Sequence, residues 1–79
     1  MGEGSSVVRT FDYRGCRVVL QAVTDVEYTR RFRATWTILR GETRVSEGST
    51  VGTFATAEQA LLSADSLARG DVDGMMPRP

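Results

Sequence analysis

The sequence has 79 residues, of which 41% are hydrophobic and 25% are charged, and this composition is ordinary for a globular domain. These proportions exclude a long disordered or collagen-like chain, and the length suits one small core rather than several domains. Ten Arg balance ten acidic residues with no Lys and no His, so the chain lacks a P-loop lysine, a Schiff-base lysine, an imidazole general base and an imidazole metal ligand.

The single cysteine and the first residues predict where the protein resides. Cys16 has no second cysteine in the chain with which to form a disulfide or a zinc site, which favours a reducing compartment. Residues 1–6 have neither the basic start nor the apolar stretch of a signal peptide, and no apolar run approaches the roughly 18 residues of a spanning helix. We therefore expect a cytoplasmic protein of a bacterial type, with residues 1–6 as a flexible N-terminus.

Two strands are expected in the first third of the chain. Residues 7–12 are strand-like, and Asp12-Tyr13-Arg14-Gly15 can turn the chain back into a second, Val-rich strand over 16–24. Both faces of this second strand carry apolar side chains, so the pattern leaves open which face is buried, and it also leaves open whether the first short strand forms. The two faces hold Cys16, Val18, Leu20 and Ala22 on one side, and Arg17, Val19, Gln21 and Val23 on the other.

The third strand, over 30–40, has the clearest alternation of apolar and polar residues. Its expected inward residues are Phe32, Ala34, Trp36 and Ile38, and its expected outward residues are Arg31, Arg33, Thr35, Thr37 and Leu39. Gly41-Glu42 suits a tight reversal into a fourth strand over 43–52. Val45 and Val51 are the expected inward residues of that strand, which Gly48 and Gly52 weaken.

One helix is expected over 57–69. Thr56 and Gln59 have the spacing of a capping box at its start. An apolar stripe recurs at helical spacing, formed by Ala57, Ala60, Leu61, Ala64, Leu67 and Ala68. Gly70 is expected to end the helix, leaving 71–79 as a flexible tail. The predicted fold is a single α+β domain over 7–70, an antiparallel meander of three or four strands (βββα or ββββα) with the C-terminal helix packed on one face.

No catalytic constellation is recognisable in the sequence. The acidic residues are scattered, and no pair of them is placed on one face of one element, as carboxylate catalysis would need. We interpret Cys16 as a small structural residue, because it opens an apolar strand. We therefore expect no enzyme, no cofactor and no metal site. The charge divides along the chain: residues 9–44 hold eight Arg and four acidic residues, a net +4, whereas 45–79 are net −3. We interpret this division as a means by which two copies complement each other electrostatically.

The outward side of the sheet is the candidate interaction face, since the helix is expected to cover the other side. Its candidate residues are Arg17, Val19, Gln21, Arg31, Arg33, Thr35, Thr37 and Leu39. Val23 shares this side, and Arg44 and Ser46 are further candidates on the fourth strand. One interpretation is a non-catalytic interaction or accessory domain that binds a protein partner or a second copy of itself through this semi-apolar, arginine-rimmed face. The alternative is nucleic-acid binding, in which the arginines contact phosphates; the zero net charge disfavours it. No membrane partner is expected.

Three short motifs carry resemblances to known families. The turn Phe11-Asp12-Tyr13-Arg14-Gly15-Cys16, the strand pair around Trp36 and the helix start Phe54-Ala55-Thr56-Ala57-Glu58-Gln59-Ala60 resemble small uncharacterised bacterial domains with a three- or four-stranded sheet and one C-terminal helix. The helix start is also similar to arm-type DNA-binding domains of phage integrases, which present their sheet to the major groove, and to HicB-like antitoxins. The chain lacks the Lys and basic excess of the former and the proline-rich turn of the latter. The first resemblance implies the fold, and none implies a functional residue.

Overall fold

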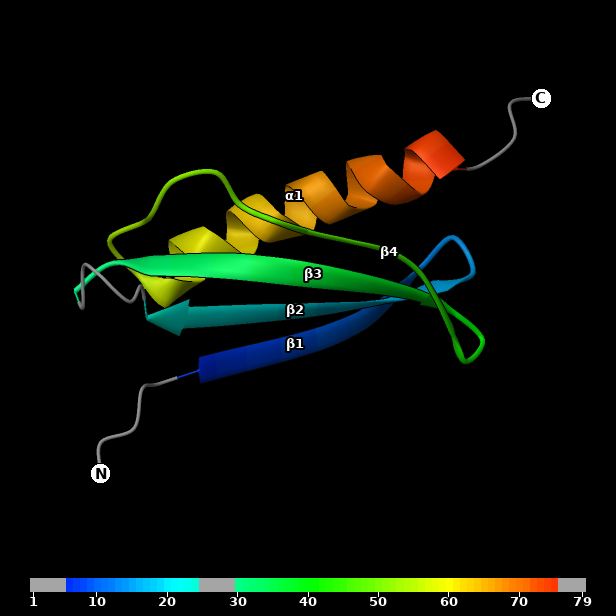
Figure 1. Cartoon of the computed structure of the whole chain (residues 1–79), viewed down its shortest axis with the longest axis horizontal. Helices are drawn as coiled ribbons and strands as arrows, with labels where there is room; N and C mark the ends of the chain where they lie inside the picture. Colours follow the sequence, from blue (N-terminus) through cyan, green and yellow to red (C-terminus); the bar gives the residue numbers. More distant parts are fainter. Residues whose placement is uncertain (1–5, 25–29, 76–79) are drawn as a thin grey trace.

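Four antiparallel strands and one helix make up the protein in a computed structural model, which describes residues 6–24 and 30–75. The strands are β1 (Ser6–Tyr13), β2 (Cys16–Thr24), β3 (Phe32–Arg40) and β4 (Thr43–Ser49), followed by α1 (Ala57–Met75). The strands lie in the sheet in their chain order, each antiparallel to the next (Figure 1). The predicted α+β meander is therefore confirmed in its four-stranded form. Of the flexible ends that we expected at residues 1–6 and 71–79, residues 1–5 and 76–79 lie outside the described residues, whereas Ser6 already belongs to β1.

Tight two-residue turns set the register of both outer hairpins. Arg14 and Gly15 connect β1 to β2 with φ angles of 53° and 85°, and positive φ at both central residues is the mark of a type I′ turn. Gly41 begins the β3–β4 turn with a φ of 64°, where a type II′ turn takes glycine. Such turns follow the twist of the flanking strands, so they continue directly into paired residues.

The core lies between the helix and one face of the two middle strands. The residues that we placed together on β2 are 0–2% exposed, and they pair with the predicted inward residues of β3: Val18 with Ile38, Leu20 with Trp36 and Ala22 with Ala34. This register resolves which face of β2 is buried. We call this side of the sheet the inner face.

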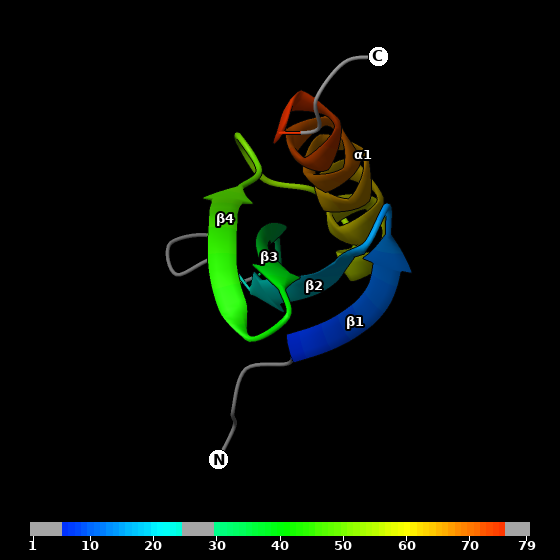
Figure 2. The ribbon, with the colours of Figure 1, turned by 90° about the vertical axis from the view of Figure 1, so that its right-hand side faces the viewer.

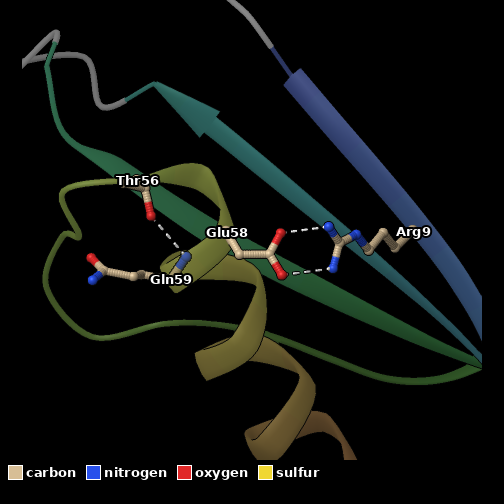
Figure 3. A network of polar contacts seen from close by, with 4 residues as sticks. All are labelled: Arg9, Thr56, Glu58 and Gln59. Atoms are coloured by element: carbon tan, nitrogen blue, oxygen red, sulfur yellow. Dashed lines mark hydrogen bonds and ion pairs between the residues drawn. The ribbon is translucent and has the colours of Figure 1, made fainter.

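Helix α1 lies mainly against β3 and β2, and the sheet curls around it with β1 and β4 at its two margins (Figure 2). The Thr56 hydroxyl accepts a hydrogen bond from the Gln59 amide at 3.1 Å, which confirms Thr56 as the N-cap (Figure 3). Small residues on the buried stripe let the helix approach the sheet closely. They are Ala60, Ala64 and Ala68, all fully buried.

The end of the helix was predicted wrongly. The helix continues through Gly70 to Met75 instead of ending at 69, so residues 71–75 are helical and not part of a flexible tail. Val72 explains the extension: it continues the stripe four residues after Ala68 and is fully buried, which offsets the roughly 0.5–1 kcal/mol that a helical glycine costs. Leu67, which we placed on the stripe, is 44% exposed.

Strand β4 also differs from its prediction. It ends at Ser49 instead of 52, and the expected inward residues Val45 and Val51 are 39% and 93% exposed. A register shift after Ile38 leaves Val45 between the paired positions, so Ser46 and Gly48 face inward instead. Gly48 is required there because a Cβ atom at this position would overlap the indole ring of Trp36.

Candidate interaction surface

The sheet's other side, which we call the outer face, is formed by cross-strand rows of side chains. On the two middle strands the rows are Arg17–Leu39, Val19–Thr37, Gln21–Thr35 and Val23–Arg33. Register extends the rows onto the edge strands, where β1 adds Val8, Thr10 and Asp12, and β4 adds Arg44, Glu47 and Ser49. Seven of the eight predicted interaction residues therefore lie together on this face.

Arg31 is the predicted residue that the structure places elsewhere. It precedes β3, which begins at Phe32, so the alternation that we applied to it does not hold. Its Nε donates to the Thr53 hydroxyl at 3.0 Å, and its Nη2 donates to the Thr53 carbonyl at 2.9 Å. Arg31 thus ties the loop before the helix to the start of β3.

The contribution of β1 was missed because the face was assigned without pairing the first strand. Of the two further candidates on β4, Arg44 lies on the outer face, whereas Ser46 faces inward because of the register shift. A signal for β1 was nonetheless present in the sequence. A two-residue turn at Arg14–Gly15 pairs Tyr13 with Cys16, and from that pair the alternation places Thr10 opposite Val19. The bulge in β4 had no comparable local signal.

The centre of the outer face is apolar and β-branched rather than charged. Val19 and Thr37 are partly buried opposite each other, and Val23 and Leu39 are partly buried at the two ends of the same strand pair. On the edge strand, Val8 is 56% exposed. A shallow hollow of about 390 Å³ lies beside this centre, lined by Thr35, Trp36, Thr37, Glu47, Gly48 and Ser49. The two middle rows, Val19–Thr37 and Gln21–Thr35, carry no charged side chain, so covering them removes no ionised group from water.

The charges of the outer face are largely balanced. Arg17 Nε lies 3.4 Å from an Asp12 carboxylate oxygen, and Arg44 Nη1 lies 3.4 Å from a Glu47 carboxylate oxygen. With Arg33, the face carries three arginines and two carboxylates, a formal charge of +1. A surface that follows a phosphate backbone needs a larger cationic excess than this.

The opposite charges of the strand and helix regions meet within one chain. The Arg9 guanidinium donates to both carboxylate oxygens of Glu58, at 2.5 and 3.3 Å (Figure 3). At the other end of the helix, Arg14 and the Tyr13 hydroxyl donate to Asp73 at 2.8 and 3.0 Å. We had interpreted the charge division as a means of joining two copies, but these contacts use much of it inside the protomer.

These contacts shift the pKa values of several side chains, among them Asp73 and Tyr13. Hydrogen bonds from Arg14, and then from Tyr13, hold the pKa of the Asp73 carboxyl below its ordinary value. The bond that the Tyr13 phenol donates to Asp73 raises the pKa of that phenol. Beside them, the Arg69 guanidinium stacks over the rings of Phe11 and Tyr13, 4.5 and 4.9 Å from their centroids. This polar cluster fastens β1 to the C-terminal half of the helix.

A second polar cluster joins the helix to the opposite margin of the sheet. One carboxylate oxygen of Asp71 accepts hydrogen bonds from Trp36 Nε1 at 3.1 Å and from the Ser46 hydroxyl at 2.5 Å. Both donors come from the inner face, so this contact holds the indole over Gly48. Because the Ser46 hydroxyl donates its hydrogen to Asp71, this serine has a structural role in packing β4 against the helix.

The candidate metal-ligating and thiol groups of the described residues are scattered or buried. Within 6–24 and 30–75, no group of three or more Cys, Asp or Glu side chains is placed to hold a metal ion. Cys16 is 1% exposed within the core, so its thiol is enclosed by apolar neighbours. In these same ranges, α1 is too polar to serve as a membrane-crossing helix.

No family model matches the chain, and no curated protein or solved structure matches it either. The resemblance to small bacterial domains is thus confirmed as a fold, a four-stranded antiparallel sheet with a C-terminal helix, and not as a family.

Proposed function

We propose that this chain is a non-catalytic protein-interaction domain that self-associates, with two copies packed through their outer faces. The observation that carries the proposal is the apolar, β-branched centre around Val19 and Thr37. In the described part of the chain, the helix covers the inner face and no element covers this one. Antiparallel sheets often leave one face in water, but uncharged middle rows together with partly buried valine and leucine side chains favour an interface.

The size of the face suits a weak but specific association. Four strands spaced by about 4.8 Å, each about 25 Å long, give a projected area of about 500 Å² per copy. Two copies would together cover about 1,000 Å², at the lower limit of specific interfaces. We therefore expect association that depends on concentration and is strongest in the aligned packing that twisted sheets prefer.

The charge balance favours a second copy over a nucleic acid as the occupant. The chain carries no net charge and the outer face is close to neutral, so two copies meet without repulsion. Arg17 and Arg44, each beside a carboxylate, form an exposed polar rim around the apolar centre, as in many protein–protein interfaces.

Sedimentation velocity up to about millimolar concentration tests this proposal. The wild type should show a concentration-dependent dimer, and Val19→Glu should weaken it at least tenfold because it places a charge in the apolar centre. Leu62→Glu is the matched control, since Leu62 lies on the exposed side of the helix and is 58% exposed. A chain that stays monomeric throughout this range would overturn the proposal.

Fluorescence anisotropy tests the nucleic-acid alternative. Labelled duplex and single-stranded probes at low salt should show no anisotropy change with the wild type if the outer face binds a second copy. Salt-sensitive binding that is lost in Arg33→Ala would support the alternative instead. Arg31→Ala is less informative, because Arg31 donates hydrogen bonds to Thr53 and its loss would also disturb the loop before the helix.

A further inference from the structure

The two edge strands of the sheet differ in how well they are protected from pairing with another chain. Strand β4 has seven residues, a register shift at Val45 and a glycine at 48, all of which make an edge irregular. Strand β1 has eight residues and pairs with β2 without any shift from Ser6 to Tyr13. It contains no glycine and no proline. The unpaired backbone N–H and C=O groups along the free edge of β1 therefore form a long and regular row.

The one inward-pointing charge of β1 does not protect this edge. Arg9 lies on the inner face, where an unneutralised charge would oppose an added strand. Both of its bonds to Glu58 satisfy that charge within the protomer. Around it, Val7 and Val8 are 39% and 56% exposed, so a further strand would remove apolar surface from water.

We propose that β1 pairs antiparallel with β1 of a second copy, about a two-fold axis perpendicular to the sheet and centred on Thr10. Such an axis keeps the inner faces of both copies on the same side, so inward residues lie opposite inward residues. Thr10 is then opposite the partner's Thr10, Arg9 opposite the partner's Phe11, and Val8 opposite the partner's Asp12.

The composition of β1 selects this register among the neighbouring ones. Centring the axis on Arg9 would place two guanidinium groups directly opposite each other, which is destabilising across strands. Centring it on Phe11 would leave only residues 9–13 paired. The Thr10 register pairs residues 7–13, opposes no like charges, and sets the Arg9 guanidinium against the partner's Phe11 ring.

The helices leave room for this pairing. Each α1 lies over β2 and β3, so the two helix axes would be separated by about four strand spacings, or about 19 Å along the sheet. This exceeds the helix diameter of about 10–12 Å. The outer faces of the two copies would then form one continuous eight-stranded surface.

The edge pairing stands apart from the proposed function, because it uses backbone groups of β1 rather than the apolar centre of the outer face. If both interfaces form, two edge-paired dimers packed through their outer faces give a closed tetramer with dihedral symmetry. That tetramer rests on the proposed function, whereas the edge-paired dimer does not.

Disulfide trapping tests the register directly. Residues opposite each other in an antiparallel pair have Cα atoms about 4.5–5.5 Å apart, within the range of a disulfide. Under mild oxidation, Thr10→Cys should form a covalent dimer. Val8→Cys and Asp12→Cys should each stay monomeric alone, because neither faces its own copy, but a mixture of the two should cross-link. The wild type controls for Cys16, which is buried.

A matched control comes from the exposed side of the helix, outside both proposed interfaces, where Leu62→Cys should not cross-link above the wild-type level. Equal trapping of Thr10→Cys, Val8→Cys and Leu62→Cys would mean random collision and would overturn the register. Trapping of Thr10→Cys that persists in the Val19→Glu background would show edge pairing independent of the outer face. Its loss there would overturn the proposal of two separate interfaces.

Discussion

The two faces of this sheet are built from the same strands with similar β-forming residues, yet they differ in what they contribute. On the inner face, Val18 and Ile38 are fully buried under the helix; on the outer face, Val19 and Thr37 are equally suited to strands but only partly buried. Strand propensity therefore does not distinguish the faces, and burial against α1 does. We expect inner-face substitutions to change stability and outer-face substitutions to change association.

The largest expected effect comes from removing a side chain that the helix inserts into the core. Leu61 is 1% exposed, and Leu61→Ala should lower the free energy of unfolding by about 2–5 kcal/mol, because it removes buried apolar contacts and leaves a cavity. Leu62→Ala, at the adjacent exposed position, should change it by less than about 0.5 kcal/mol. Urea unfolding followed by circular dichroism measures both. Similar losses at the two positions would contradict a helix buried on one side only.

Two glycine substitutions should change the free energy of unfolding in opposite directions, because Gly48 faces Trp36 on the inner face and Gly70 is exposed on the helix. Gly48→Ala should destabilise by about 1–3 kcal/mol, since the new methyl group overlaps the Trp36 ring, which Asp71 holds in place. Gly70→Ala should stabilise by about 0.5–1 kcal/mol, because Gly70 is helical and a Cβ there meets no atom within 4 Å. Thermal or urea unfolding of both variants measures the two changes in stability. A stabilised Gly48→Ala would mean that the indole does not occupy this space.

Local patterns explain why the inner residues of β2 and β3 could be predicted from the sequence. Alternation fixes which side chains share a face, and two-residue turns such as Arg14–Gly15 fix the register between strands. The cap at Thr56 is likewise a contact between near neighbours in the chain. Seven of the eight predicted outer-face residues follow from the same alternation, and Arg31 does not because it lies before the strand begins.

The features that the sequence did not reveal depend on contacts between distant residues. Val45 and Val51 are suitable inward residues by composition, but a register shift after Ile38 displaces Val45 and β4 ends before Val51. At position 48, the Trp36 ring leaves room only for glycine. The helix passes Gly70 because Val72 is buried against the sheet. Arg9 and Glu58 are 49 residues apart, and neither residue alone indicates that the charges of β1 and α1 pair within one chain.

The smallest expected effect concerns the exposed margin of the inner face, where Asp73 accepts bonds from Arg14 and Tyr13. Because these bonds lower the pKa of the folded Asp73 carboxyl, they stabilise the protein above the unfolded value of about 3.9, and this contribution is lost as the pH falls through the folded pKa. Asp73→Asn should therefore be less stable than the wild type near neutral pH, with the difference closing in acid. Water screens the pair, since the Asp73 side chain is 47% exposed, so the difference should be small.

Ultraviolet titration of the Tyr13 phenol tests the same contact between Tyr13 and Asp73. In a Tyr28→Phe background, Tyr13 is the only tyrosine of the chain, and its absorbance should change above the ordinary tyrosine pH because Asp73 raises its pKa. Adding Asp73→Asn should move that transition to lower pH. A transition that does not move, together with a stability difference that is constant with pH, would mean that the carboxylate of Asp73 does not join the margin of β1 to the helix.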